Sequence, residues 1–332
     1  MRWVRIALAL ALVGVALMAA ASWWLHRPLV LASDPLELSI EPGSSPREIA
    51  EAWVRAGVRS EPAALYEWFR WSGQARRIRA GSYQIGAGTT PIDLLEKMVR
   101  GEQTQDYIRF TEGWTFRQIR DQLAHAASLK HTIDGLSDED VMRELGAPGQ
   151  SPEGRFHPDT YAYSKGSTDL AVLKRAYRAM QVRLAAAWQE RSADTPLHNP
   201  DEALTLASIV EKETGVEADR GLVAGVFVNR LRLGMPLQTD PTIIFGLGTA
   251  FDGSLHKRDL QTDSPYNTYL HAGLPPTPIS IPGRAALLAA VRPEATKALY
   301  FVARGDGSSE FSATLTEHNR AVNRYQRKPA SP

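Results

Sequence analysis

The chain has 332 residues, of which 43% are hydrophobic and 23% are charged, and its formal net charge is +1. This is the balance of an ordinary globular protein with room for about two domains, and nothing in the near-neutral charge indicates a nucleic-acid binder. Because the sequence contains no cysteine, it also excludes disulfides, thiol nucleophiles and cysteine-ligated metal sites.

The N-terminus carries an uncharged apolar segment at residues 6–25, which reads IALALALVGVALMAAASWWL. This length is sufficient for one helix across the hydrocarbon layer of a bilayer. Arg2 and Arg5 precede the segment, so the positive-inside rule places the N-terminus in the cytoplasm. Trp23 and Trp24 stand where an interfacial aromatic belt is expected. Residues 1–27 are therefore expected to form a cytoplasmic tip and a transmembrane anchor.

A cleaved signal peptide is the alternative interpretation of the same segment. The small residues 19–21 are of the kind found at signal-peptidase sites. The apolar run exceeds the usual length of a signal-peptide core, which favours a retained anchor. Both interpretations place the chain beyond Arg27 outside the cytoplasm.

Residues 28–128 are expected to form one region, whose first residues belong to a short tether at 26–35. Short strand and helix patterns alternate along the rest of it. Ser45 and Glu48 form a capping box, with Pro46 at the first helical position. The strand–turn–helix pattern occurs three times, and such units resemble LysM-like modules that bind glycan chains; plain α+β scaffolding explains the same pattern. The expected strands are 36–40, 80–85 and 107–110, and the expected helices are 46–56, 62–72, 91–99 and 115–124.

The second half of the chain predicts a mixed α+β domain at residues 151–327, after a junction at 129–150. A turn at 305–307 predicts a hairpin, and residues 328–332 are expected to be a disordered tail. The fold class is therefore α+β: a transmembrane helix, small LysM-like modules and a mixed domain. The expected helices of this domain are 169–191, 200–214, 222–233 and 283–291, and its hairpin strands are 298–303 and 310–313.

The run ASIVEKETG at 207–215 ends a helix that Asn199 begins and Gly215 is expected to stop. Helical periodicity gives this helix one apolar face, with Thr205, Ser208 and Lys212 opposite. The two glutamates of the run, Glu211 and Glu213, fall on the two flanks of the apolar face and are nearly equivalent by phase.

Position along the helix favours Glu213 as a general acid. It lies in the final turn, where the helix dipole disfavours a carboxylate, and partial burial raises a carboxyl pKa in the same direction. A carboxyl that stays protonated near neutral pH can donate its proton in catalysis. The alternative is that Glu211 and Glu213 are surface glutamates on either side of Lys212.

Several further motifs occur in a fixed order around this run, and together with it they resemble the endolytic murein transglycosylase family, the YceG-like proteins. The resemblance covers nearly the whole chain, including the N-terminal anchor. The motifs are EGRFHPDTY at 153–161, VFVNRL at 226–231, LGMPLQTDPTIIFGLG at 233–248, SPYNTY at 264–269, GLPP at 273–276 and YFVA at 300–303.

The resemblance implies an enzyme that cleaves the β-1,4 bond between N-acetylmuramic acid and N-acetylglucosamine within peptidoglycan strands, leaving a 1,6-anhydro end. It implies that Glu213 is the catalytic residue, with Glu211 supporting or structural, and that no cofactor is needed. It also implies a single-pass protein of the bacterial inner membrane with its catalytic domain in the periplasm. The implied partners are peptidoglycan strands and the cell-wall synthases, and the resemblance implies no nucleic-acid partner.

The polar run at 237–242 is expected to be a turn-forming loop opposite Glu213. Gln238, Thr239 and Asp240 are expected to bind sugar hydroxyl and acetamido groups or to orient Glu213; turn chemistry explains the same residues. Tyr266, Asn267 and Tyr269 are expected to line a groove that binds glycan, or alternatively to pack in the core. Residues 156–161 offer another wall or a structural segment.

Two other functions are compatible with the residues. A hydrolase of the same bond would use Asp240 or Glu211 as its second carboxylate. A non-catalytic peptidoglycan-binding protein would use neither. The eight histidines show no HExxH or comparable ligand spacing, so no metal site is expected.

Overall fold

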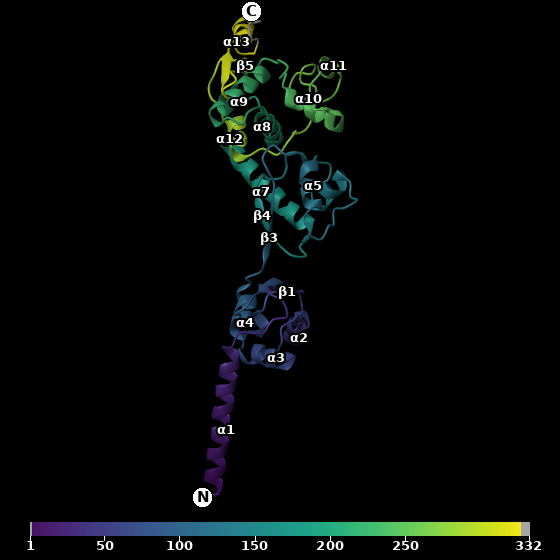
Figure 1. Cartoon of the computed structure of the whole chain (residues 1–332). Coiled ribbons are helices and arrows are strands. Elements are labelled where there is room, and N and C mark those ends of the chain that lie inside the picture. Colours follow the sequence, from purple (N-terminus) through teal and green to yellow (C-terminus); the bar gives the residue numbers. More distant parts are fainter. Residues whose placement is uncertain (1, 327–332) are drawn as a thin grey trace, which may run out of the picture. The chain divides into compact units, whose positions relative to one another are not determined.

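The computed structural model describes residues 2–326, so the predicted disordered tail at 328–332 lies outside the described residues. The chain divides into two compact units (Figure 1). Unit 1 comprises Met1–Tyr107 with Ala162–Ser167, and unit 2 comprises Ile108–Tyr161 with Thr168–Pro332. Helices dominate both units, and the strands form three two-stranded sheets, β1-β2, β3-β4 and β5-β6. The predicted mixed α+β class is confirmed.

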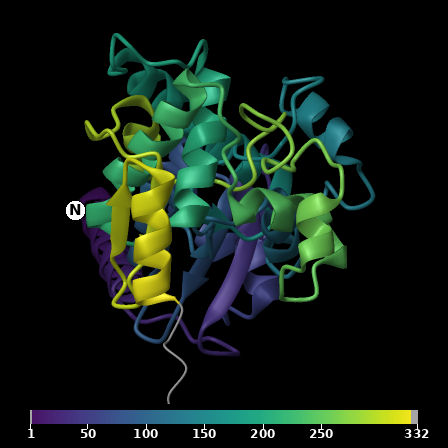
Figure 2. The same cartoon turned by 90° about the horizontal axis from the view of Figure 1, so that it is seen from above.

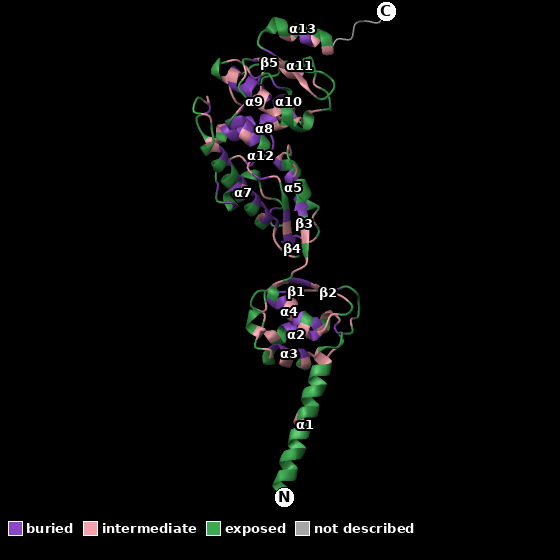
Figure 3. Ribbon diagram, turned by 90° about the vertical axis from the view of Figure 1, so that its left-hand side faces the viewer, coloured by how far each residue is buried: buried purple, intermediate pink, exposed green. Residues whose placement is uncertain are grey.

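The first element, α1 (Arg2–Leu25), is a single apolar helix. Its most apolar stretch has a mean hydropathy of 2.3, and no residue of that stretch is buried. Figure 3 shows the helix exposed along its length. By length and composition α1 can cross a membrane, a property that a signal sequence near an N-terminus shares.

Unit 1 is built around one antiparallel pair, β1 (Leu36–Ile40) with β2 (Gly81–Ile85), in which Leu36 pairs with Ile85. The predicted capping box of Ser45 and Glu48 is present at the start of the first helix. Because β1 pairs with β2, the first two of the three predicted strand–helix units belong to one core. That core also holds the helices α2 (Pro46–Ala56), α3 (Pro62–Trp71) and α4 (Pro91–Arg100), together with the short turn η1 (Ala75–Arg77).

The segment 26–35, expected to be a short tether, is packed against unit 1. Leu29 is buried and its N–H donates to the carbonyl of Thr89 at 2.8 Å. The N–H of Ala32 donates to Gly57, where an added Cβ would lie 2.9 Å from the Ala32 side chain. The segment therefore packs on unit 1 through backbone hydrogen bonds, which apolar periodicity does not reveal.

The chain leaves unit 1 along β3 (Gln105–Arg109) and returns along β4 (Thr160–Ser164). The sequence did not predict β4, because five residues between Pro158 and Gly166 give too short a pattern. Two further helices lie between these strands in the sequence, α5 (Phe116–Ala124) and α6 (Asp138–Glu144).

Unit 2 is centred on α8 (Pro200–Glu213), which packs most extensively against α12 (Arg284–Val291). Figure 2 shows α13 (Leu315–Tyr325) beside the C-terminal hairpin, with which it is in contact. The sequence did not predict α10, α11 or α13. The remaining elements are α7 (Asp169–Gln189), α9 (Glu217–Arg232), α10 (Asp240–Leu247), η2 (Gly248–Ala250), α11 (Lys257–Gln261), β5 (Tyr300–Ala303) and β6 (Ser309–Ser312).

The prediction that α8 has a solvent-facing side at Thr205 and Ser208 is wrong. Both residues are buried, and Ser208 is fully so. Its hydroxyl accepts the N–H of Ile279 at 3.0 Å, and its carbonyl accepts the hydroxyl of Ser280 at 3.1 Å. A segment distant in the sequence therefore covers the polar side of the helix. Gly154 lies against this segment, where an added Cβ would meet Pro278 at 2.5 Å.

Candidate active site

Glu213 is the last residue of α8. The predicted cap at Asn199 is present, with its side chain accepting the N–H of Glu202 at 2.9 Å. Thr214, the residue after the helix, already has an extended backbone, so α8 stops one residue earlier than the sequence predicted. From this end of α8 the carboxyl of Glu213 accepts a hydrogen bond from the hydroxyl of Thr239 at 2.7 Å. The predicted meeting of Glu213 with the 237–242 segment is therefore observed.

Burial and two neighbouring side chains act on the pKa of Glu213. Burial raises the pKa most, and the negative charge of Asp240 raises it further. The hydrogen bond from Thr239 acts in the opposite direction, because it stabilises the charged carboxylate. The net effect raises the pKa of Glu213 above its ordinary value. A carboxyl with a raised pKa keeps its proton to a higher pH than an exposed glutamate does, which favours its use as a general acid.

Buried threonines hold Thr239 in place. The N–H of Thr239 donates to the hydroxyl of Thr268 at 3.2 Å, and its carbonyl accepts the hydroxyl of Thr242 at 2.7 Å. The hydroxyls of Thr242 and Thr268 lie 2.8 Å apart. The 237–242 segment is thus only in part the expected loop, because α10 begins at Asp240. The loop ends in a constrained turn, in which Gln238 has a φ of 51°.

Arg230 fixes the other side of this turn and was not predicted as a site residue. Its side chain is 7% exposed, and within residues 2–326 it forms no ion pair with a carboxylate. The guanidinium donates to the carbonyls of Pro236 and Leu237 and to the side chain of Gln238 at 2.9–3.2 Å. It also donates to Leu299 at 2.7 Å. A buried cation bonded to carbonyls holds a defined backbone path, which here leads to Thr239.

Asp240 is exposed and is oriented by Tyr269. The phenol hydroxyl donates to Oδ1 of Asp240 at 2.6 Å. Burial raises the pKa of Tyr269, and the charges of Asp240 and Glu213 raise it further, so the phenol remains a donor. Within residues 2–326, Oδ2 of Asp240 has no hydrogen-bond partner and is open to a ligand. The sequence named Tyr269 only as part of a groove.

Glu211 occupies a different position from Glu213. Its carboxyl accepts the N–H of Gly283, which caps the start of α12, at 2.9 Å. The side chain of Glu112 lies against the same glycine, where an added Cβ would be 2.0 Å from its oxygen. Burial raises the pKa of Glu211, and the charge of Glu112 adds to this effect. The contacts of Glu211 therefore join α8 to α12.

Tyr266 and Asn267 lie in the loop that carries Tyr269. Asn267 is 1% exposed; its amide group donates to the carbonyls of Leu260 and Thr262 and accepts the N–H of Tyr269 at 3.0 Å. The ring of Tyr266 packs edge-on against Phe245 at 4.9 Å, and its hydroxyl lies 2.8 Å from that of Thr277. These contacts give both residues a supporting position.

The segment 156–161 is structural. Phe156 is fully buried and stacks on Phe116 at 5.1 Å, and the hydroxyl of Tyr161 donates to the carbonyl of His157 at 2.6 Å. Of the two interpretations of this segment, the large side chains fit the structural one, because Phe156 and Tyr161 are buried, whereas Asp159 is exposed.

One group of side chains among residues 2–326 has metal-ligand spacing. The ligand atoms of His131, Asp134 and Asp169 lie within 4.8 Å of one another. The carboxylate of Asp169 accepts bonds from Thr132 and from the N–H of Ile133, so its oxygens already anchor the loop between α5 and α6 to the start of α7. This group is remote in sequence from the Glu213 motif.

The family of the chain follows from comparison with known proteins. The model of the YceG-like family matches residues 38–324, and the chain belongs to this family. The resemblance noted in the sequence is thereby confirmed.

Named relatives agree with this assignment. The chain is 32% identical over 307 residues to a Bacillus subtilis protein named endolytic murein transglycosylase, with 87% of this chain and 84% of the relative covered. It is 27% identical to a Streptococcus pneumoniae protein of the same name, of which it spans 57%. The crystal structure of a YceG-like protein from Listeria monocytogenes is similar, with 29% identity, a TM-score of 0.54 and coverage of 87% of this chain and 99% of the other.

Proposed function

We propose that this protein is a peptidoglycan lytic transglycosylase that cuts within glycan strands. It cleaves the β-1,4 bond between N-acetylmuramic acid and N-acetylglucosamine and leaves a 1,6-anhydro-muramoyl end. The observation that carries the proposal is the carboxyl of Glu213, which has a raised pKa and a 2.7 Å bond to Thr239. The names of two curated relatives supply the substrate class.

Glu213 performs two proton transfers in this reaction. As an acid it protonates the glycosidic oxygen while the bond to the muramoyl C1 breaks through an oxocarbenium-like state. The muramoyl C6 hydroxyl then attacks C1, and the carboxylate of Glu213 accepts the hydroxyl proton. The new C6–O–C1 bond, an internal acetal, replaces the glycosidic bond to the released sugar, so no water is consumed. One carboxyl is sufficient for both steps, because the proton that it donates in the first step is replaced in the second.

The neighbouring groups divide into orienting and binding residues. Thr239 orients Glu213 through its hydroxyl, and the side chains of Gln238 and Asp240 are exposed to receive sugar hydroxyl or acetamido groups. Glu211 supports the end of α8 through Gly283. Tyr266 and Asn267 support the loop that positions Tyr269. The catalytic domain is proposed to span 151–327.

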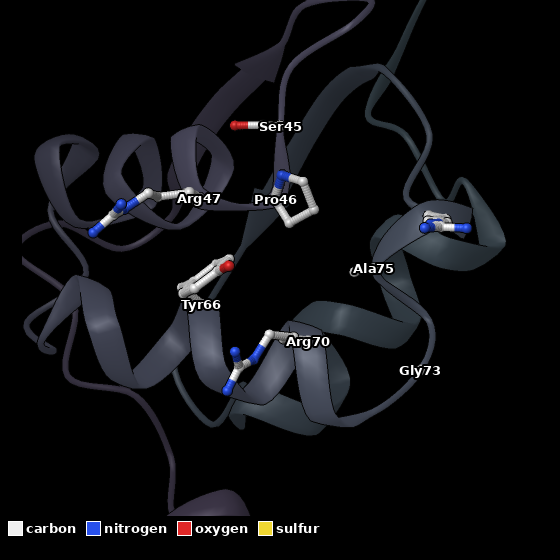
Figure 4. Close-up of a pocket in the computed structure, with 8 residues that line it drawn as sticks. Ser45, Pro46, Arg47, Tyr66, Arg70, Gly73 and Ala75 are labelled. Carbon is white, nitrogen blue, oxygen red and sulfur yellow. The ribbon is translucent and has the colours of Figure 1, made fainter.

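Unit 1 supplies a second proposed contact with the glycan, in the LysM-like region at 28–128. An open pocket of about 540 Å³ lies between α2 and α3. Figure 4 shows Tyr66 and Arg70 projecting from α3 and Arg47 from α2 around it. The ring of Tyr66 lies 5.8 Å from the guanidinium of Arg47. An aromatic face beside polar donors suits a pyranose ring.

The helix α1 is proposed as a single-pass anchor in the bacterial inner membrane, with both units in the periplasm. Arg2 and Arg5 set this orientation by the positive-inside rule. An enzyme anchored there meets glycan strands as they are made, and the cell-wall synthases are its proposed partners.

Product analysis tests the reaction. Glycan strands incubated with the full chain in detergent should give products with 1,6-anhydro ends, lighter by one water than hydrolysis products. Glu213→Gln should lower the rate by about 100- to 10,000-fold, because it removes the general acid and base. Glu217→Gln, an exposed glutamate in the first turn of α9, is the matched control and should keep full activity.

Three outcomes would contradict the proposal. Products with a reducing end would identify a hydrolase, in which Asp240 becomes the second carboxylate. Unchanged cleavage by Glu213→Gln would remove this residue from the chemistry. If neither the wild-type chain nor the variants cut glycan but all bind it, the protein is a non-catalytic peptidoglycan-binding protein.

A further inference from the structure

Unit 1 begins within a few residues of the end of α1. Trp24, in the last turn of α1, packs against the hydrophobic core of unit 1. Leu29 is only 8% exposed, and its N–H donates to the carbonyl of Thr89 at 2.8 Å. No free linker therefore separates the apolar helix from the folded unit.

The length of α1 determines what unit 1 must touch. Its 24 residues span about 36 Å at the rise of an α-helix. The hydrocarbon core of a bilayer is about 30 Å thick and is covered by headgroups on each side. If α1 spans the membrane, as proposed above, its C-terminal end lies among the headgroups. The nearest surface of unit 1 then lies in contact with them.

The contacts of α4 identify that surface. Leu29 bonds to Thr89, directly before the N-cap of α4, and α1 itself contacts α4. On the other side, Trp68 of α3 donates from its indole to the carbonyl of Pro91, the first residue of α4, at 2.9 Å. Trp71 lies three residues after Trp68 and shares its side of the helix. The C-terminal half of α3 is therefore close to the end of α1.

The exposed side chains there have the chemistry of a membrane interface. Trp71 is 78% exposed, and the guanidinium of Arg70 lies 5.5 Å from its ring. Glu67 accepts the indole N–H of Trp71 and forms an ion pair with Arg70. Trp23 is 63% exposed, and Arg27 lies 4.8 Å from its ring. Indole rings favour the headgroup layer, because one face is apolar and the N–H is polar, and arginine stems extend alongside them to reach phosphates.

We propose that the α3 surface bearing Trp71 and Arg70 rests in the headgroup layer of the membrane that α1 crosses. The partner is the phospholipid surface itself. Arg70 also lines the pocket next to Tyr66. The pocket then opens at the level of the membrane surface, where it receives glycan held close to the bilayer.

The absence of cysteine makes the test direct, because one introduced cysteine is a unique labelling site. Trp71→Cys and Tyr107→Cys are each labelled with an environment-sensitive fluorophore in the full chain, which is then inserted into phospholipid vesicles. Tyr107 is the matched control: it is an aromatic residue of unit 1, is 67% exposed and lies in β3. Lipids with a nitroxide on the headgroup serve as quenchers.

The label at position 71 should be quenched and its emission shifted to shorter wavelength, whereas the label at 107 should show neither change. Equal quenching at both positions, or none at 71, would overturn the proposal. Flotation of the full chain with the vesicles reports insertion of α1 separately. A chain that floats without quenching at 71 disproves only the contact of α3, and a chain that does not float disproves the anchor on which it rests. An unchanged thermal unfolding curve confirms that both variants fold.

Discussion

Two neighbours of Glu213 act on its proton in opposite directions. The hydroxyl of Thr239 stabilises the carboxylate, whereas the charge of Asp240 stabilises the protonated acid. Burial of Glu213 raises its pKa in the same direction as Asp240 does. The nearby charge of Arg230 lowers the pKa of Tyr269. Replacing either neighbour alone therefore moves the titration of Glu213 in a direction that depends on which neighbour is lost.

Thr239→Val removes the hydroxyl and keeps the volume of the buried side chain. We expect the rate constant for glycan cleavage to fall by about 10- to 100-fold, because Glu213 loses an orienting hydrogen bond. The pKa of Glu213 should rise, so the alkaline limb of the pH–rate profile should move to higher pH. Thr239→Ser retains the hydroxyl and is the control; a profile identical to that of Thr239→Val would contradict the assigned role.

Asp240→Asn removes the negative charge near Glu213 and keeps the side-chain shape. The pKa of Glu213 should then fall, and because the acid must be protonated, the alkaline limb should move to lower pH. The measurement is the same pH–rate profile, compared with Asp194→Asn, an exposed aspartate elsewhere in unit 2. A limb that stays in place or moves upward would show that the charge of Asp240 does not reach Glu213.

Helical phase left Glu211 and Glu213 nearly equivalent, and the structure explains why. Phase describes only the helix that carries the two residues. Their difference comes from other elements: Gly283 binds Glu211, and Thr239 binds Glu213. Local patterns likewise could not identify Arg230 and Tyr269 as site residues. Their hydrogen-bond partners Leu299 and Asp240 lie far from them in the sequence.

At the scale of elements, the start of α5 depends on a carboxyl from another segment. Both oxygens of Glu153 lie 3.1 Å from the N–H of Phe116, the first residue of the helix. Burial raises the pKa of Glu153 to about 7, and this outweighs the opposing effect of the hydrogen bond. The folded protein therefore holds this proton more tightly than the unfolded chain does.

Glu153→Gln should change how stability depends on pH. A raised carboxyl pKa stabilises the fold below the ordinary value of 4.5, and this contribution is lost as the pH rises to about 7. The loss in the wild-type chain amounts to at most about 3 kcal/mol. Thermal unfolding of the full chain in detergent between these pH values should show the decline in the wild-type chain and a flatter curve in the variant.

The control for this comparison is Glu139→Gln, because Glu139 is an exposed glutamate of α6 in the same unit. Its unfolding should follow the wild-type curve. An undiminished decline in Glu153→Gln would mean that other groups take up the proton.

Helices with local end signals were predicted well. In the capping boxes at Ser45, Thr90 and Thr115, the two residues that bond to each other are three positions apart, so a short stretch of sequence contains both. α10 was not predicted, since its eight residues begin in the polar run and its start is held by Thr268 from another loop. Short helices depend on tertiary packing for their stability, and periodicity alone does not identify them.

At the scale of the whole molecule, unit 1 is proposed to add a glycan-binding contact to the one beside Glu213 in unit 2. Tyr66→Ala removes the aromatic wall of the unit 1 pocket without altering unit 2. In a Glu213→Gln background, the full chain carrying Tyr66→Ala should bind glycan strands about tenfold more weakly, as loss of an aromatic anchor does. Sedimentation with insoluble peptidoglycan measures the difference.

Val182→Ala is the matched control, because Val182 is 70% exposed on α7 in unit 2. It should leave binding unchanged. Equal binding by Tyr66→Ala and the control would assign glycan recognition to unit 2 alone.

The sequence by itself determined the apolar helix, the capped helices and the family, because each depends on residues that are close together in the chain or on motifs kept in order. It also singled out Glu213. Only the tertiary structure decided what surrounds that carboxyl: Thr239 hydrogen-bonded to it, Asp240 held by Tyr269, and Arg230 fixing the turn between α9 and α10. The physical reason is that a carboxyl pKa depends on burial, charge and hydrogen bonds in space, and the groups that supply them here lie far from Glu213 in the sequence.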